Sequence, residues 1–305
     1  MKRNIYSKLW MIFFVLMGAA CTNQVEDAIP VSGQPIGFSV QSDWKEILNT
    51  RSNDKTQFGP NDEIQIFGFH KPFRDADENV QFMYKEGDPT TGQKVTYDNG
   101  NWNYSPKRFW PKKGVLDFFA SYPYNSVHYD VGNKRMTYNN NLTQDLLYGL
   151  ATNRDCASKE TVSIWMVHAL AKVRIILDES LGDIGQVTVS GYKTGHFSPI
   201  NNGVPAWEID NVNTHIYADF RKYEGKVDEE LKNNNSVTVF ILPDKITGLK
   251  MWNSVEQEID ASEEIKKHTF LAGKVYNLTI SKSNGVRKKN TNSRSIAMSV
   301  HCVSE

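Results

Sequence analysis

The sequence lacks an excess of charge of either sign. Its 35 Lys and Arg residues are balanced by 35 Asp and Glu residues, so nothing in the composition favours nucleic acid, and we predict no nucleic-acid partner. Also missing are a phosphate-binding glycine loop, a Gly-x-Ser-x-Gly nucleophile motif and any pair of histidines at metal-ligand spacing. We therefore predict that the chain is not an enzyme and has no catalytic residues, no metal site and no cofactor.

Long hydrophobic runs are absent except near the N-terminus. The apolar stretch 9–17 follows three basic residues and is shorter than the about 20 residues of a transmembrane helix. Small residues then lead to Cys21, a pattern typical of a secretory signal with a bacterial lipobox, although Gly18 stands where Leu is usual. We predict a lipoprotein signal peptide at 1–20, lipidation of Cys21 and a flexible tether at 21–34. The alternative is a plain cleaved signal with an incidental cysteine.

Cysteine is scarce, with three residues in the whole chain. If Cys21 carries lipid, Cys156 and Cys302 remain, and an oxidising compartment would allow them to pair. They lie far apart in the sequence, and one is almost at its end. We interpret them as two isolated thiols, with a disulfide as the alternative.

No segment has the pattern of a long helix. Short runs that alternate apolar and polar residues are separated by turn signals such as Asn99-Gly100. The stretch 101–124 is the densest of these, and within it Val115 to Tyr122 is nearly continuously apolar, which predicts a strand buried on both faces. Many short strands with regular turns indicate an all-β chain built from β-sandwiches.

Polar breaks predict where the domains end. The break at 153–160 separates an N-terminal β-sandwich at 35–155 from a C-terminal β-sandwich at 156–281. Residues 282–305 form a basic tail whose last part, from Ser295 to Val303, alternates like a strand and needs a partner edge. Four residues would lie on one face of this strand: Ile296, Met298, Val300 and Cys302.

The aromatic residues between 101 and 124 allow two interpretations. Exposed, they would form a platform that stacks on sugar rings; packed inside, they would be core, and their apolar neighbourhood favours the core. The residues concerned are Trp102, Tyr104, Phe109 and Trp110. Exposure of Trp102 or Trp110 in one flat patch would favour our alternative function, a surface glycan-binding lipoprotein associated with nutrient uptake. Burial of both would count against it.

A polar loop at 50–54 follows the first alternating strand, which spans 36–40. An exposed Arg51 in this loop is a plausible target for a trypsin-like protease, with Ser52 as the new N-terminus. A cut there would detach the first strand and leave a groove that a strand of another chain could fill. An ordinary loop arginine is the simpler interpretation of the sequence alone.

Several short motifs, in this order, resemble the fimbrillin family, which comprises the Mfa-like lipoproteins and type V pilin-like subunits of Gram-negative anaerobes. The resemblance covers about residues 35–280. The motifs are Ile36-Gly37-Phe38, Thr50-Arg51, the run from Phe58 to Phe69, Phe82-Met83-Tyr84, Trp102 to Pro106, Phe109-Trp110-Pro111, Phe118 to Tyr124, Asp145 to Tyr148, Val167 to Val173 and Leu271 to Tyr276.

The resemblance implies two transthyretin-like β-sandwich domains in tandem and a lipoprotein precursor carried to the cell outer membrane, with palmitate or a similar acyl chain at Cys21. It also implies assembly by donor-strand exchange after a trypsin-like surface protease cuts between Arg51 and Ser52. The donor strand would contain Ile296, Met298, Val300 and Cys302.

From this resemblance we predict a structural subunit or accessory component of cell-surface fimbriae with a role in adhesion. Its partners would be other fimbrial subunits or further copies of itself. The basic tail departs from the family's ordinary ending, so shaft, tip and anchor roles stay open.

Overall fold

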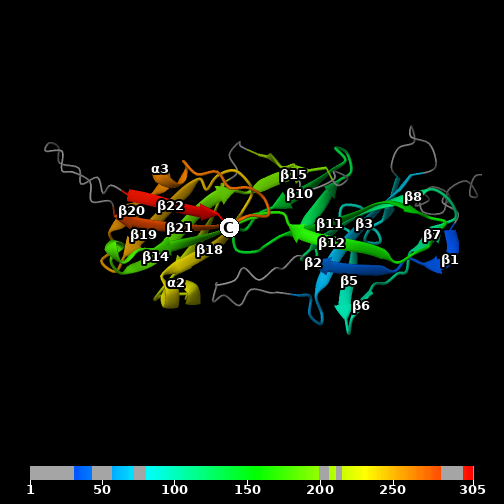
Figure 1. The fold of residues 1–305 in the computed structure, drawn as a ribbon, viewed down its shortest axis with the longest axis horizontal. Helices are drawn as coiled ribbons and strands as arrows, with labels where there is room; N and C mark the ends of the chain where they lie inside the picture. Colours follow the sequence, from blue (N-terminus) through cyan, green and yellow to red (C-terminus); the bar gives the residue numbers. More distant parts are fainter. Residues whose placement is uncertain are drawn as a thin grey trace, which may run out of the picture.

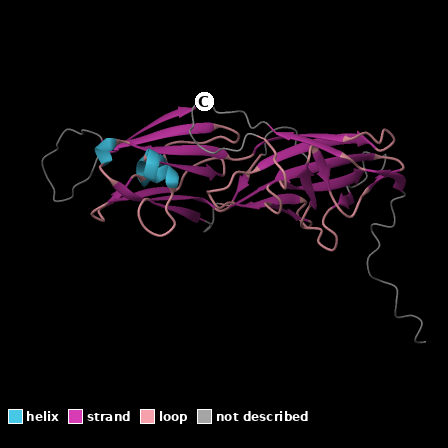
Figure 2. Cartoon of the chain, turned by 90° about the horizontal axis from the view of Figure 1, so that it is seen from below, coloured by secondary structure: helices cyan, strands magenta, loops and turns pink. Residues whose placement is uncertain are grey.

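The protein folds almost entirely into β-strands, which confirms the predicted all-β class. The computed structural model describes residues 31–42, 57–71, 80–198, 206–210, 215–282 and 298–304. These residues form an elongated molecule with an N-terminal and a C-terminal lobe along its long axis (Figure 1). Figure 2 shows how little of the described chain is helical.

The N-terminal lobe is built on one eight-stranded sheet. Its strand order is β2-β12-β11-β8-β3-β5-β6, and β4 pairs with β3 outside this path. The strands are β2 (Phe38–Ser42), β12 (Val162–His168), β11 (Leu147–Asp155), β8 (Val115–Tyr122), β3 (Glu63–Lys71), β5 (Gln93–Asp98), β6 (Asn101–Asn103) and β4 (Val80–Met83).

This sheet curls around its core. The two ends of the strand order approach each other, since the Trp102 indole on β6 donates a hydrogen bond to the Val40 carbonyl on β2 over 3.3 Å. A small antiparallel pair, β1 (Val31–Pro35) with β7 (Phe109–Pro111), lies beside the sheet and brings the buried Trp110 into the same core.

Strand β8 is buried on both faces, as predicted from its apolar run. Phe118 packs into the core enclosed by the curled sheet, whereas Phe119 points into a second core on the outer face. Because successive side chains of a strand point to opposite faces, only a nearly continuous apolar sequence can serve two cores at once.

The C-terminal lobe consists of two four-stranded sheets that share one core. The first has the order β18 (Ser236–Ile241), β13 (Ala171–Leu177), β21 (Val275–Lys282) and β22 (Met298–Ser304). The second has the order β17 (His215–Arg221), β14 (Ile184–Tyr192), β19 (Gly248–Asn253) and β20 (Glu258–Asp260). The described helices are short: η2 (Glu179–Leu181), α2 (Glu229–Asn234) and α3 (Ser262–Ile265).

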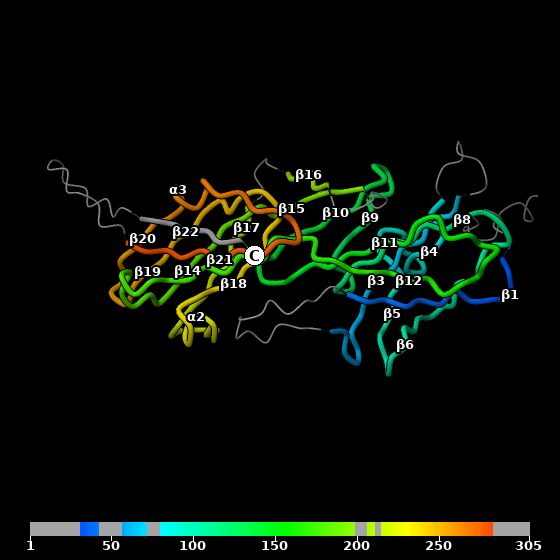
Figure 3. Tube along the Cα trace, viewed as in Figure 1, coloured from blue at the N-terminus to red at the C-terminus, as the bar shows by residue number. Residues whose placement is uncertain are grey.

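A further four-stranded sheet joins the two halves of the chain. It has the order β16 (Glu208–Ile209), β15 (Thr194–Phe197), β10 (Arg135–Asn139) and β9 (Val127–Asp130), so strands from before and after residue 170 pair directly. Figure 3 shows this sheet between the lobes. Its inner face packs on the outer face of the N-terminal sheet and forms the core that includes Phe119 and Phe197.

The sheets change along the chain between β12 and β13, because Val162–His168 pairs with β2 and β11 in the N-terminal sheet. The predicted boundary between residues 155 and 156 therefore precedes the last strand of that sheet. As strand pairing does not define independent folding units, the boundary stays a prediction. So does the tandem transthyretin-like arrangement. No helix in the described part of the chain is long and apolar enough to span a membrane.

The core shared by the N-terminal sheet and the sheet that joins the two halves should contribute to the stability of the whole chain. The Phe119 ring lies 6.2 Å from Phe67, 6.3 Å from Tyr148 and 5.7 Å from Phe197, between ring centroids. We expect Phe119→Ala to lower the free energy of unfolding by about 3–5 kcal/mol, because it leaves a cavity between the halves. Urea unfolding measures this loss.

The control for this variant is Val255→Ala, since Val255 is 78% exposed and its truncation should change the free energy by less than about 0.5 kcal/mol. Equal stability of the two variants would contradict the assignment of Phe119 to a shared core.

Candidate functional site

The site that bears most directly on the predicted function is the place in the N-terminal sheet that strand β2 and the preceding Ile36 occupy. We call it the seat of β2. This strand lies at one end of the N-terminal sheet, and β12, with which it pairs in parallel, is its only strand partner among the described residues. The register places Phe38 opposite Val162 and Val40 opposite Ile164. An edge strand with one ladder is the element that a sheet can lose at least cost to its other strands.

The inward-facing side chains of this segment belong to the core. Ile36, Phe38 and Val40 are 2%, 7% and 6% exposed, whereas Ser39, between Phe38 and Val40, and Gln41, after Val40, are exposed. The Phe38 ring meets Tyr104 and Phe118 edge-on, with centroids 5.7 and 5.4 Å apart. The seat therefore has three apolar positions, two residues apart, as a strand with one buried face requires.

A second set of contacts holds the edge of β2 that faces away from β12. The Tyr104 hydroxyl donates to the Ile36 carbonyl over 2.8 Å, and the Trp102 indole donates to the Val40 carbonyl over 3.3 Å. The Ile36 amide donates to the Arg108 carbonyl over 2.9 Å. Burial raises the pKa of the Tyr104 phenol, which keeps the hydroxyl protonated and able to donate.

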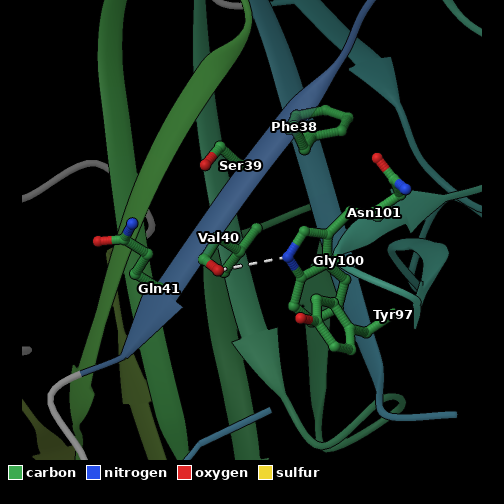
Figure 4. A pocket seen from close by; sticks show the side chains of 8 residues that line it. Phe38, Ser39, Val40, Gln41, Tyr97, Gly100 and Asn101 are labelled. Carbon is green, nitrogen blue, oxygen red and sulfur yellow. Dashed lines mark hydrogen bonds between the residues drawn. The ribbon is translucent and has the colours of Figure 1, made fainter. Parts of the chain in front are cut away.

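Between these contacts the seat is open. A cleft of about 410 Å³ lies between β2 and the β5–β6 hairpin. Figure 4 shows the labelled residues around it, with Phe38 and Tyr97 on the side of the hairpin and Ser39 and Gln41 across the strand. The cleft is lined by Phe38, Ser39, Val40, Gln41, Tyr97, Gly100, Asn101 and Trp102. The hydrogen bonds at Ile36 and Val40 thus lie on either side of a stretch that the β5–β6 hairpin does not cover.

The predicted site residues fall in two groups. Cys21, Arg51, Ser52 and Ile296 lie outside the described residues. The other donor-strand residues lie in β22, which pairs antiparallel with β21 of the same chain. In this register Val300 is opposite Ile280 and Cys302 is opposite Leu278, two buried core residues, while Met298 is opposite Lys282. The partner edge that the tail needs is thus supplied within the chain, and the donor role stays a prediction.

Three of the four aromatic residues singled out in 101–124, Trp102, Tyr104 and Trp110, pack inside, whereas Phe109 is 37% exposed. Trp102 is 8% exposed and Trp110 is 1% exposed, which counts against a sugar-binding platform made from them. Sequence reasoning identified them as core but missed that Trp102 and Tyr104 also fix the backbone of β2. The signal for this role was their chemistry: a buried indole or phenol needs a hydrogen-bond acceptor.

Cys156 is a buried free thiol. Burial, followed by the charge of Asp155, raises the pKa of the thiol to about 12, so the group stays protonated and unreactive at neutral pH. A structural thiol is the interpretation that this environment favours.

Within the described ranges, no group of three or more His, Cys, Asp or Glu side chains is placed to hold a metal ion. His168, interpreted from the sequence as a structural histidine, contacts the Asp145 carboxylate through Nδ1. The absence of catalysis, metal and cofactor stays a prediction.

Comparisons with known proteins identify the class. A search of the curated proteins returned no significant match. Among solved structures, a candidate cell adhesion protein from Bacteroides uniformis matches with a TM-score of 0.54 at 16% identity, over 89% of this chain and 98% of that one. A candidate cell adhesion protein from Bacteroides ovatus matches with a TM-score of 0.51 at 14% identity, over 90% and 96%. At these identities the matches show a shared fold.

The family follows from the sequence. The model of the fimbrillin-like family matches residues 50–297. This is most of the chain, and the chain belongs to that family. The resemblance drawn from the motifs is therefore confirmed, and a cell-surface location goes with the family.

The seat generates a prediction about local stability. Phe38→Ala removes the largest apolar side chain that β2 inserts into the core, and such truncations cost about 3–5 kcal/mol. Because β2 has one ladder, we expect the loss to appear first as local opening. Hydrogen exchange should show faster exchange of the β2 amides, while the amides of β8 stay protected.

The matched control is Ser39→Ala, one residue along the same strand and exposed. It keeps the backbone pairing and all three buried side chains. Equal protection of β2 in the two variants would show that Phe38 does not hold the strand.

Proposed function

We propose that the chain is a structural subunit or accessory component of cell-surface fimbriae, assembled by proteolytic processing and donor-strand exchange, with a role in adhesion. Its membership in the fimbrillin-like family supports the fimbrial role. The observation that carries the assembly mechanism is the seat of β2, an apolar edge strand that fills a core through Phe38 and Val40, together with Ile36 just before the strand.

The energetics of the seat support exchange. Burying an apolar side chain contributes about 1.5–3 kcal/mol, and ordering the backbone costs about 1–2 kcal/mol per residue. For a short strand with three buried side chains these opposing quantities are similar. The covalent connection to the rest of the chain is then what keeps β2 in place, and a cut between Arg51 and Ser52 would remove it.

The proposed donor is the tail strand that contains Ile296, Met298, Val300 and Cys302. Apolar residues recur every second position there, which is the spacing of the three apolar positions in the seat. In the free chain, β22 pairs with β21. A donor strand would leave that edge to enter the seat of another copy or of another fimbrial subunit.

We place the protein at the cell outer membrane as a surface-exposed lipoprotein and in the fimbrium, held by acylation of Cys21, with a trypsin-like surface protease as a processing partner. The alternative, a glycan-binding lipoprotein associated with nutrient uptake, depended on exposure of Trp102 or Trp110. Both are buried, so these residues no longer favour it.

Assembly is tested by treating the purified precursor with trypsin and following its size by gel filtration. We expect cleavage after Arg51 and growth of oligomers. A variant without residues 295–305 should be cut but stay monomeric, because it lacks the donor strand. Arg51→Ala should remain intact at this position, whereas Arg221→Ala, an exposed arginine on β17, should behave like the parent chain.

Undiminished polymerisation of the truncated variant would disprove the tail as donor. Polymerisation of uncut Arg51→Ala would disprove the need for processing.

Anchoring is tested by intact-mass measurement on protein isolated from the cell surface. We expect two forms, one that begins at acylated Cys21 and one that begins at Ser52, because the first is the precursor and the second is the processed subunit. Cys21→Ser should abolish the acylated form and release the protein into the medium. A mature N-terminus without an acyl chain would contradict lipidation.

A further inference from the structure

The end of the N-terminal lobe that lies farthest from the C-terminal lobe carries the pair of strands β1 and β7 (Figure 1). Val31, the first residue of β1, is opposite Pro111, the last residue of β7. Lys112 and Lys113 follow directly, in the turn before β8. The two lysines therefore lie where the described chain begins.

The loop between β11 and β12 is held at the same end. The Cys156 amide donates a hydrogen bond to the Gly114 carbonyl over 3.0 Å, and the Gln34 side-chain amide donates to the Lys159 carbonyl over 2.9 Å. This loop thus contacts both β1 and the turn after β7. We define the lobe tip as residues 31–35, 107–115 and 154–160.

The lobe tip is positively charged, although the whole chain is balanced. Within it, the segment 107–115 has four cations and no carboxylate. Lys112 and Lys113 are exposed, and neither makes an ion pair with another described residue. The charged residues of the tip are six basic ones, Lys107, Arg108, Lys112, Lys113, Arg154 and Lys159, and two acidic ones, Asp155 and Glu160.

The two cations that precede Phe109 already have partners in the protein. The Lys107 ammonium lies 4.5 Å from the centre of the Tyr104 ring. The Arg108 guanidinium lies over the Tyr84 ring and donates to the Tyr84 carbonyl over 3.4 Å. Lys112 and Lys113 are therefore the cations of segment 107–115 that are available to bind an anionic group outside the protein.

Exposed apolar side chains accompany these lysines. Val31 is 42% exposed and Phe109 is 37% exposed, and they belong to the paired strands β1 and β7. Protein surfaces that lie on a membrane combine basic side chains with aromatic or aliphatic ones. Because a membrane is extended and covers a whole end of a molecule, such groups need to share that end but need not touch one another. The lobe tip meets this condition.

The chain that precedes Val31 selects the membrane among anionic partners. Cys21, the proposed site of acylation, is ten residues earlier, and ten residues span at most about 36 Å. An acyl chain in the outer membrane would keep the lobe tip close to the lipid surface. The tip could then come within the Debye length of about 10 Å over which anionic headgroups attract lysines. This step rests on the proposed acylation, whereas the charge and the apolar content of the tip do not.

We propose that the lobe tip docks on a membrane surface whose headgroups bear phosphate. Lys112 and Lys113 bind the phosphates, and Val31 and Phe109 enter the apolar boundary beneath the headgroups. The C-terminal lobe lies at the opposite end of the long axis (Figure 1) and would point away from the membrane. Its tail strand β22 would then be accessible to other subunits.

Processing would weaken this contact. A cut between Arg51 and Ser52 removes Val31 together with β1 and separates the lobe tip from Cys21. Docking is therefore a property of the precursor, and the processed subunit would leave the membrane more readily. This consequence rests on the proposed cleavage, whereas docking itself does not.

The test is sedimentation with lipid vesicles of the full mature chain, which begins at residue 21 and carries Cys21→Ser so that no acyl chain contributes. One set of vesicles contains phosphatidylglycerol and phosphatidylcholine in equal amounts, and the other contains phosphatidylcholine alone. We expect at least about tenfold stronger binding to the anionic vesicles. Raising the salt from about 0.05 M to about 0.5 M should weaken this binding, because the Debye length shortens.

Two double variants assign the binding to the tip. Lys112→Ala with Lys113→Ala should weaken it about 25-fold, because each lysine at an anionic surface contributes about fivefold. The matched control is Lys266→Ala with Lys267→Ala, two adjacent lysines after α3 in the C-terminal lobe. It changes the net charge equally and should leave binding unchanged. Thermal melting of both variants should match the parent, since all four side chains are exposed.

A soluble polyanion is the competing partner, and heparin serves as its probe. Phe109→Ala should weaken vesicle binding about fivefold, because an apolar side chain gains free energy when it leaves water. The same variant should leave heparin binding unchanged, since heparin offers no apolar layer that the ring could enter.

Equal binding to anionic and neutral vesicles would overturn the proposal, as would unchanged binding of the Lys112 and Lys113 double variant or an equal loss in its control. Vesicle binding that survives Phe109→Ala in full would show that the tip recognises polyanions and not a membrane. Surface protein without an acyl chain would disprove the anchor but would not change the vesicle results, so the two proposals can fail separately.

Discussion

The insertion of Phe38 between Tyr104 and Phe118 is the contact on which the arrangement of the N-terminal sheet depends. It brings an edge strand over a core that would otherwise open to water between β12 and β6. The Tyr104 and Trp102 hydrogen bonds then fix the far edge of the strand. These donors come from β6 and the residue just after it, at the opposite end of the sheet order from β2. The hydrogen bonds therefore link the two ends of the sheet. A core with this geometry needs an apolar strand in that place, because without one its buried side chains would be exposed to water.

The packing on the other face of the same sheet holds its central strand β8 in position. Phe119, next to Phe118, packs against Phe197 of β15, so the central strand is shared between the enclosed core and the core that joins the lobes. Close-packed interiors transmit strain and resist gradual deformation. Loss of β2 would therefore open one core while the other keeps β8 in position. A subunit that exchanges an edge strand needs such a fixed centre, since an unsupported sheet would collapse when the strand leaves.

The sequence predicts local features of this arrangement well and its long-range features poorly. Alternation at Ile36, Phe38 and Val40 identifies the strand, and the continuous apolar run of β8 identifies a strand with two buried faces. Nothing local indicates that β2 pairs in parallel with β12, because a parallel ladder joins residues distant in the chain. For the same reason the break at 153–160 gave no sign that β12, which follows it, pairs with β2 and β11 in the N-terminal sheet. The exposure of Trp165 could have been deduced from alternation in β12, but its position between Gln41 and Leu150 depends on the pairing of β12 with β2 and β11.

The direction of the proposed exchange follows from the residues on the two strands. A donor strand that leaves β21 for the seat of β2 loses one ladder of backbone hydrogen bonds and gains another. Each such bond contributes about 0.5–1.5 kcal/mol net, so the loss and the gain nearly cancel. The apolar side chains do not favour the donor either, because Met298, Val300 and Cys302 offer no ring in place of that of Phe38. Competition between β2 and the donor strand would thus leave β2 in its seat. While β2 stays covalently attached, it is also present at a higher effective concentration than a donor from another chain. Cleavage removes that advantage irreversibly, and the processed subunit is then trapped without its own strand. Proteolysis, more than affinity, would therefore set the order of assembly.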